Sequence, residues 1–182
     1  MRSFFYLLCF LVLASFELDA QKLQKVELID GIKAKVPSNF YRMQDRDILE
    51  RYMVYKMPLA MYSSEDRLAE FGLAISDNFW EGNDLELLGE FQESNLNHLY
   101  DKVKIEDKGV KTLHKHQAYF FELTSATRYS TSYEKKYTIM QYMIVQNRIL
   151  VFNFSCPAFD REKYEEAARQ IMNSIQIKKD PF

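Results

Sequence analysis

Four strand-like segments follow one another in the second half of this chain, with no helical pattern between them. They are KVKIED from Lys102, QAYFFELTSA from Gln117, KYTIMQYMIV from Lys136 and RILVFNFS from Arg148. Each is rich in the aromatic and β-branched residues that favour strands. Strands joined by short connections pair antiparallel, because a parallel pair needs a long crossover. The sequence therefore predicts an antiparallel sheet.

The residues after the last strand predict an amphipathic helix. Pro157 ends the strand, and Asp160 can cap a helix because its carboxylate can accept from a free backbone amide of the first turn. Apolar residues then recur at three- and four-residue spacing, at Tyr164, Ala167, Ala168, Ile171, Met172 and Ile175. This spacing places them on one helix face, which must pack on the sheet.

Two further strand pairs are predicted in the first half of the chain. KVELIDGIKAKVP alternates apolar and polar residues around Asp30 and Gly31, the dipeptide most favoured in a two-residue hairpin turn with positive φ at both positions. LAMY and LAEFGLAIS flank the turn SSED and predict the second pair. Between the pairs, Asp45 or Asp47 can cap a short helix through DILERY.

A longer helix is expected after the second pair. Asn83 and Glu86 have the spacing of a capping box, in which both side chains accept from free backbone amides. The helix is predicted to run to about Tyr100, weakened slightly by Gly89. Its buried stripe is expected to hold Leu85, Leu88, Leu96 and Leu99, with Phe91 at the edge.

These elements predict one domain of the α+β class. The chain has only four prolines and five glycines, and no linker, repeat or like-charge block divides it. Strands lie early and late, with helices between and after them and no regular strand–helix–strand alternation. We therefore expect residues 21–182 to form an antiparallel β-sheet flanked by helices on both faces, an α/β/α sandwich.

Residues 1–20 have the layout of a secretory signal peptide. The apolar run FFYLLCFLVLASF comes directly after a short basic start. It is shorter than the roughly 20 residues that span hydrocarbon as a helix, so an uncleaved anchor is the less favoured interpretation. We expect cleavage between Ala20 and Gln21, with a cut after Ala14 or Ser15 as the alternative. The mature chain is then exported, periplasmic or extracellular, without a transmembrane segment.

The charge balance argues against two classes of partner. Lys and Arg number 24 and Asp and Glu 26, which gives a formal net charge of −2. A nucleic-acid-binding domain would show a basic face, and a domain held on anionic lipid would show a polybasic stretch. The sequence has neither, so no nucleic acid is expected as a partner.

Cys156 is the single cysteine of the expected mature chain, because Cys9 leaves with the signal peptide. An internal disulfide is thereby excluded. Cys156 shares its strand face with Phe154 and Phe152, so its thiol is expected to pack in an apolar layer. A nucleophile would need a neighbouring cation, a histidine or a helix N-terminus, and only the helix starting near Asp160 is close in sequence. Catalysis by this thiol is the minor alternative.

His114 and His116 could place two imidazoles on one strand face and share a zinc or copper ion. Glu106 or Asp107 on a neighbouring strand could supply a third ligand. The alternative is a polar hairpin tip without metal. We favour the hairpin tip and expect no metal and no cofactor.

Aromatic residues supply the candidate partner-binding positions. Tyr129 and Tyr133, with Arg128, fall in a polar stretch that is predicted to be a loop over residues 125–136. Long ordered loops often carry function, and tyrosine and arginine are favoured interface anchors. Trp80 is a further candidate, although it could simply fold over the start of its helix.

Several segments together resemble the PsbP-like superfamily, which includes Ran-binding Mog proteins, bacterial DcrB-like proteins and many secreted bacterial proteins. They are AKVPSNF, FGLAISDNFW before an acidic helix start, YFFELTS, YTIMQYMIVQNRILVFNFSCPA and YEEAARQIMNSIQI. Their order and spacing over the whole mature chain carry the resemblance. It implies an antiparallel sheet flanked by helices, no catalytic residues, and action by binding other proteins. The photosystem role of one branch is not carried over.

We therefore expect an exported, non-enzymatic module that binds another protein. One alternative is a carrier that holds an apolar ligand between sheet and helices, in a cavity of about 300 Å³ or more lined by Phe and Leu. The other is an enzyme that uses Cys156 or a histidine-bound metal.

Overall fold

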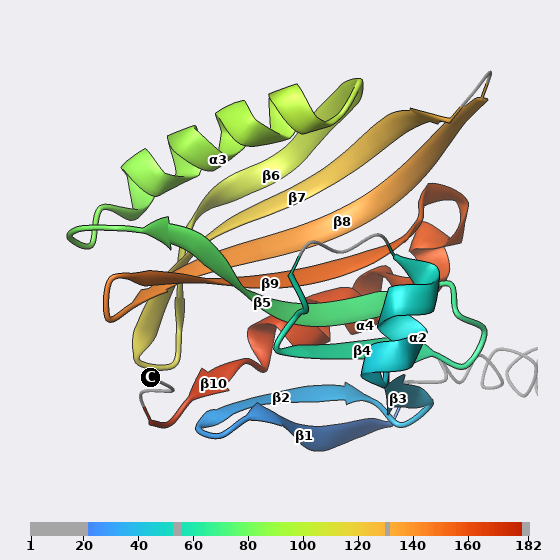
Figure 1. The fold of residues 1–182 in the computed structure, drawn as a ribbon, viewed down its shortest axis with the longest axis horizontal. Coiled ribbons are helices and arrows are strands. Elements are labelled where there is room, and N and C mark those ends of the chain that lie inside the picture. The colour runs from blue at the N-terminus through green and yellow to red at the C-terminus, as the bar shows by residue number, and fades with distance from the viewer. Residues whose placement is uncertain (1–21, 53–55, 130–131, 180–182) are drawn as a thin grey trace, which may run out of the picture.

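The computed structural model of the protein describes residues 22–52, 56–129 and 132–179 (Figure 1). Its main element is a seven-stranded sheet in the order β3-β4-β5-β9-β8-β7-β6, with antiparallel neighbours throughout. The predicted antiparallel sheet is confirmed. Its strands are β3 (Phe40–Arg42), β4 (Ala60–Ser64), β5 (Glu70–Phe79), β6 (Lys102–Leu113), β7 (His116–Tyr129), β8 (Ser132–Val145) and β9 (Arg148–Pro157).

Two tight turns join the later strands. Gln146 and Asn147 connect β8 to β9 with φ of 51° and 60°, the two positive values that a type I′ turn requires. His114 and Lys115 connect β6 to β7, and His114 has a φ of 55°. Short turns with positive φ match the twist of the strands, which explains why these hairpins form directly from neighbouring segments.

The hairpin of β7 and β8 is longer than the sequence predicts. Pairing continues to Tyr129, which lies opposite Ser132. The loop predicted over residues 125–136 is therefore wrong, and most of that stretch is strand. Its polar composition hides this, because each strand is held by backbone hydrogen bonds to the other and needs no apolar face for them.

Helices cover both faces of the sheet, which confirms the α/β/α arrangement (Figure 1). On one face, α3 (Leu85–Leu99) packs against β6 and β7. On the other, α4 (Arg161–Asn173) follows the short helix η1 (Ala158–Asp160) and packs against β8 and β9. The predicted stripe is buried in full, comprising Tyr164, Ala167, Ala168, Ile171, Met172 and Ile175.

The caps of α3 and α4 differ in detail from the prediction. Asp84 caps α3 in place of Asn83, and its carboxylate accepts from the Leu87 amide at 2.9 Å. Asp160 is the N-cap residue of α4 as predicted, but its side chain makes no capping hydrogen bond. Neighbouring polar residues compete for a cap, and the backbone path decides which one reaches the amides.

The stripe of α3 also differs at its end. Leu85, Leu88 and Leu96 are buried, but Leu99 is 70% exposed. Leu99 is the last residue of the helix, and its neighbour Tyr100 packs against the apolar cluster in its place.

A small second sheet completes the molecule, in the order β1-β2-β10. Its strands are β1 (Leu23–Ile29), β2 (Ile32–Pro37) and β10 (Gln176–Ile177). The predicted hairpin is confirmed, although only Gly31 of the turn has a positive φ, of 83°. A Cβ on Gly31 would come within 2.7 Å of the Lys179 carbonyl oxygen, so the C-terminal segment packs closely over this turn.

The short helix α2 (Asp45–Arg51) lies between β3 and β4 in the chain. Its N-cap is Gln44, whose backbone N–H donates to the Asp47 carboxylate at 3.4 Å, so neither predicted aspartate occupies the cap.

The predicted signal peptide, residues 1–20, lies outside the described residues. None of the helices within the described ranges is long and apolar enough to cross a membrane.

Candidate functional site

The strand register creates a row of small and polar side chains on the α3 side of the sheet. Thr138 on β8 lies opposite Ser155 on β9, which lies opposite Glu70 on β5. In the next row, Asn153 lies between Met140 and Gly72. Alternate residues of a strand point to the same face, so all of these lie on the side of the sheet that carries α3.

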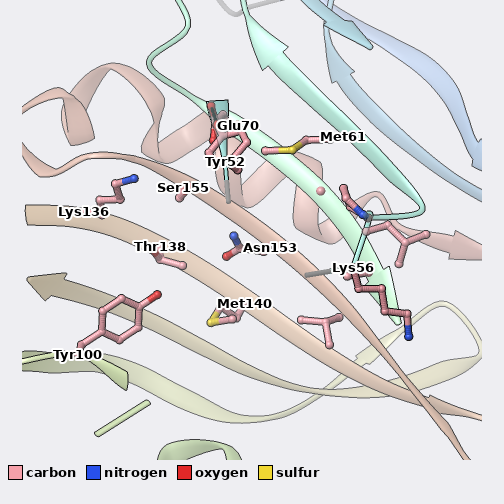
Figure 2. A pocket seen from close by; sticks show the side chains of 15 residues that line it. Tyr52, Lys56, Met61, Glu70, Tyr100, Lys136, Thr138, Met140, Asn153 and Ser155 are labelled. Carbon is pink, nitrogen blue, oxygen red and sulfur yellow. Dashed lines mark hydrogen bonds between the residues drawn. The ribbon is translucent and has the colours of Figure 1, made fainter. Parts of the chain in front are cut away.

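The two helices on this side leave the middle of the sheet open. α3 packs over β6 and β7, while α2 lies over β4 and β5, where Arg51 donates to the Ser63 hydroxyl at 3.2 Å (Figure 1). Between them is a cavity of about 370 Å³. Figure 2 shows it with β8 and β9 as its floor. It is lined by Tyr52, Lys56, Pro58, Met61, Glu70, Gly72, Leu73, Ala74, Tyr100, Lys136, Thr138, Met140, Val151, Asn153 and Ser155.

A second cavity of about 310 Å³ continues the first toward the start of β8 and the end of β9. The two share Tyr52, Glu70, Lys136 and Ser155, so they form one open depression, which we call the trough. The far end of the trough is lined by Arg51, Arg67, Leu68, Glu134, Cys156 and Pro157.

One wall of the trough is fixed by a partly buried ionic contact. The Arg51 guanidinium donates to the Glu70 carboxylate at 2.6 Å. The Tyr52 hydroxyl, which Figure 2 shows beside Glu70, donates to the same carboxylate. Burial, together with the hydrogen bond to this carboxylate, raises the pKa of Tyr52 well above its usual value. The phenol therefore stays protonated at neutral pH and holds the wall in place.

The floor of the trough holds a polar atom without a partner. The Asn153 Oδ1 atom is buried and accepts no hydrogen bond within the described residues. The side chains of Thr138 and Ser155 line the cavity beside it. Buried polar atoms nearly always have a hydrogen-bond partner in folded proteins. The unpaired Oδ1 atom of Asn153 is therefore an exception, and a bound ligand could explain it.

Cys156 lies where the sequence predicts, in the apolar layer on the opposite face from Asn153 and Ser155. It is a free thiol, and only 2% of the residue is exposed. Burial, assisted by the charge of Asp160, raises its pKa to about 12. The thiolate that a nucleophile needs is therefore strongly disfavoured at neutral pH.

The two histidines of the predicted metal pair do not share a strand. His114 is a turn residue, and His116 is the first residue of β7. Glu106, a possible third ligand, instead pairs with Arg161 at 2.5 Å and accepts from Thr124. Across the described ranges, no group of three or more metal-ligating side chains comes together.

Trp80 is half-buried and packs against the cluster under α3. Its ring centroid lies 6.0 Å from that of Phe91, and its amide donates to the Asn147 carbonyl at 2.8 Å. It thus folds against its helix and is not part of the trough.

Arg128, Tyr129 and Tyr133 lie near the end of the β7–β8 hairpin, and their side chains fall outside the described residues. Glu134 and Lys136 of the same hairpin line the trough. The predicted binding segment therefore borders the trough, while the floor itself was missed. The polar residues Asn153 and Ser155, alternating with buried phenylalanines on β9, are the sequence signal that could have revealed it.

Comparison with known proteins identifies the fold. The chain matches no family model and no curated protein sequence. It is similar to cyanobacterial PsbP from Synechocystis sp. PCC 6803, with a TM-score of 0.59, 9% identity, and coverage of 88% of this chain and 95% of that one.

Two more solved structures are similar. The Ran-binding protein Mog1p of Saccharomyces cerevisiae has a TM-score of 0.59 at 10% identity, covering 87% and 96% of the two chains. PA94 from Pseudomonas aeruginosa, a protein of unknown function, has a TM-score of 0.51 at 11% identity, covering 84% and 94%. This chain thus has the fold of these three solved structures.

Proposed function

We propose that the protein is an exported, non-enzymatic binding module that holds part of a partner protein in the trough. The observation that carries this proposal is the open floor of β8 and β9, which combines a buried unpaired acceptor, the Asn153 Oδ1 atom, with apolar walls. Binding pockets typically combine an apolar lining with a few convergent polar groups. A surface that only needed to face water would leave no buried acceptor unpaired.

Two further observations support a protein partner. The yeast protein of the same fold is, by its name, a Ran-binding protein. The trough wall carries Tyr100, and tyrosine buries a large apolar area while keeping its hydroxyl available to water or a partner.

The β7–β8 hairpin supplies a second contact in this proposal. Its end carries Arg128, Tyr129 and Tyr133, and its base lines the trough through Glu134 and Lys136. A partner lying in the trough would therefore meet the hairpin end. Trp80, shortly before the start of α3, remains the alternative docking point.

The role of the trough in partner binding is tested by a substitution at Gly72 that places a large side chain in the cavity. A Cβ at this position would lie 3.5 Å from the Ala60 carbonyl oxygen, an ordinary contact, so a side chain can be added without strain. Tagged wild-type protein is purified from its native host and its bound proteins are quantified, alongside Gly72→Phe and the matched control Gly72→Ala. We expect the control to retain the partner and Gly72→Phe to lose it. Retention by Gly72→Phe at wild-type levels would contradict a role for the trough.

Export is tested separately. Intact-mass spectrometry of the protein recovered outside the cytoplasm should give a chain that begins at Gln21, because the apolar run and Ala20 fit a signal peptide and its cleavage site. A product that keeps residues 1–20 would contradict export by cleavage, and a start near Ser15 would only move the cut.

The carrier alternative has one observation in its favour, since the main cavity exceeds the volume that it requires. The lining does not fit: among the described residues around that cavity there is no phenylalanine and a single leucine, Leu73. Native mass spectrometry of the purified protein separates the two ideas, because a carrier would retain an apolar ligand.

A further inference from the structure

We propose that the trough recognises the main chain of an extended, uncharged peptide segment, and that Asn153 is the residue that binds it. This inference rests on the proposed function and names the part of the partner that is recognised.

The position of Asn153 is the first argument. Its neighbours in the row across the sheet are Met140 and Gly72, neither of which offers a side-chain N–H or O–H. The Oδ1 atom is therefore buried with no donor among the described residues. A leucine has nearly the same shape and would remove this unfavourable group, so the amide is unfavourable for folding alone.

The chemistry of a primary amide is the second argument. Asparagine presents an acceptor and a donor side by side in one plane, and a peptide unit presents the complementary pair. Once the Asn153 side chain rotates to bring Oδ1 to the surface of the trough, an extended chain lying over it can donate its N–H to Oδ1 and accept from Nδ2 with its carbonyl. Apolar ligands offer neither group.

The spacing of the floor is the third argument. Ser155 follows Asn153 on the same face of β9 at about 6.6–6.8 Å, twice the rise per residue of a strand. An extended peptide lying along β9 repeats its backbone groups at the same interval, so one segment can meet both side chains. Thr138, opposite Ser155, adds a hydroxyl to that second position.

The charges around the trough argue for an uncharged segment. Arg51 is paired with Glu70, Lys56 with Asp77, and Lys136 with Glu134. A charged side chain entering the main cavity would lose water at a place where the charged groups already have partners, whereas Arg67 lies at the far end of the trough. The apolar lining of Met61, Met140 and Val151 instead suits apolar side chains.

The longest free edge strand to which an extended segment could add is β6. That edge is protected, because it carries Lys102, Lys104 and Lys108 and a register shift between Ile105 and Asp107. Lysines and bulges are the usual means by which sheet edges resist added strands. The trough is therefore the better site for an extended chain.

The test selects peptides from a phage-displayed library of random twelve-residue sequences against the wild-type protein. Synthetic versions of the selected peptides are then titrated against wild type, Asn153→Leu, Gly72→Phe and the control Asn97→Leu, which alters an exposed asparagine of α3. We expect uncharged peptides whose affinity falls at least tenfold in Asn153→Leu and in Gly72→Phe, and is unchanged in Asn97→Leu.

Two further readouts separate recognition from structure. Replacing the contacting peptide N–H by an ester oxygen should weaken binding to wild type but cause little further loss with Asn153→Leu. The same variant should raise the midpoint of thermal unfolding by about 2–4 °C, since it removes an unsatisfied group from a chain of this size. A variant that is more stable and yet binds less tightly cannot be explained by misfolding.

The outcomes distinguish this inference from the function on which it rests. If peptide affinity falls in Gly72→Phe but is unchanged in Asn153→Leu, the role of Asn153 is overturned and the trough remains the binding site. If peptide affinity is unchanged in both variants, both proposals are overturned. Failure to select any peptide would overturn main-chain recognition, while a folded partner could still occupy the trough.

Discussion

Cys156 and Asn153 lie three residues apart on β9 and face opposite sides of the sheet. The thiol points into the layer of phenylalanines under α4, and the amide points into the trough. The alternation of a strand therefore separates the two groups that could carry chemistry. Cys156, the residue type that could act as a nucleophile, is buried and protonated. Asn153, which has no chemical reactivity of its own, is the candidate for binding.

Cys156→Ser is expected to lower the free energy of unfolding by about 1–2 kcal/mol, because a hydroxyl would enter an apolar layer with no assured partner. Partner binding should be unchanged. Chemical denaturation measures the first and co-purification the second. Thiol labelling gives the control: wild-type protein should react slowly, whereas Ser155→Cys in the Cys156→Ser background should react fast, since its thiol faces the trough. Fast labelling of Cys156 in the folded wild-type protein would contradict its burial and support the alternative that it is a nucleophile.

At the scale of the elements, α3 sets the position of one trough wall. It begins at its Asp84 cap and ends at Tyr100, which lines the trough. Between these ends it lies unusually close to the sheet, because Gly89 has no side chain over Tyr119. Two local features therefore position this wall of the trough: the Asp84 cap, which starts the helix, and Gly89, which lets the helix approach Tyr119 closely.

Asp84→Ala is expected to cost about 1 kcal/mol of stability, the usual value of a lost N-cap, because the Leu87 amide loses its acceptor. The matched control is Asn83→Ala, the cap that the sequence predicts, which should change stability by less than about 0.5 kcal/mol. Urea denaturation of both variants decides between them. A larger loss of stability in Asn83→Ala than in Asp84→Ala would instead support Asn83 as the N-cap, as the sequence predicts.

Gly89→Ala is expected to cost about 1–3 kcal/mol despite the better helix propensity of alanine, because the new Cβ would lie 2.3 Å from the Tyr119 ring. In a double-mutant cycle, Tyr119→Leu should recover much of this loss by removing the ring. Ser94→Ala, on the exposed face of α3, is the control and should be nearly neutral. Full additivity in the cycle would show that the two residues do not compete for space.

At the scale of the whole molecule, carboxylates attach α4 to the rest of the fold. Buried Glu122 accepts from Arg161 at 3.1 Å, from Arg169 at 2.8 Å and from the Tyr137 hydroxyl at 2.8 Å. Asp66 accepts from Lys163 at 2.6 Å. One helix is therefore connected to β7, to β8 and to the turn before β5 through acidic groups.

Stability should fall as the pH is lowered below about 4.5, the usual range of carboxylate pKa values. For Asp66, burial raises the pKa, but hydrogen bonds from Lys163, Ser64 and Tyr164 outweigh it and hold the pKa far below its usual value. The hydrogen bond from Arg161 lowers the pKa of Glu165. A carboxyl with a lowered folded-state pKa contributes stability above its unfolded-state pKa and loses it as the pH falls toward the folded value.

The measurement is chemical denaturation at pH 7, 4.5 and 3. Asp66→Asn should be less stable than wild type at pH 7 and should decline less between pH 7 and 3. Glu162→Gln, at an exposed position of α4, is the control and should follow the wild-type curve. A parallel decline of Asp66→Asn and wild type would contradict the assigned role of Asp66.

Most elements and most of their buried faces were predictable from the residue pattern alone. The alternation on β9 predicted the side on which Cys156 packs, and the three- and four-residue spacing predicted the whole buried stripe of α4. These patterns are local, because a strand repeats every two residues and a helix every 3.6, so they can be read without knowing the neighbours. Turn chemistry is local too, as Gln146 and Asn147 illustrate.

The position of the candidate site depends on how the elements pack together, which the residue pattern does not show. Gly72, Thr138 and Asn153 come from three separate strands and meet because β9 pairs with both β5 and β8. The trough also depends on how far α2 and α3 extend across the sheet, which is a matter of packing between elements. The length of the β7–β8 hairpin was hidden for the same reason, since pairing with another strand, and not its own composition, holds each strand in place.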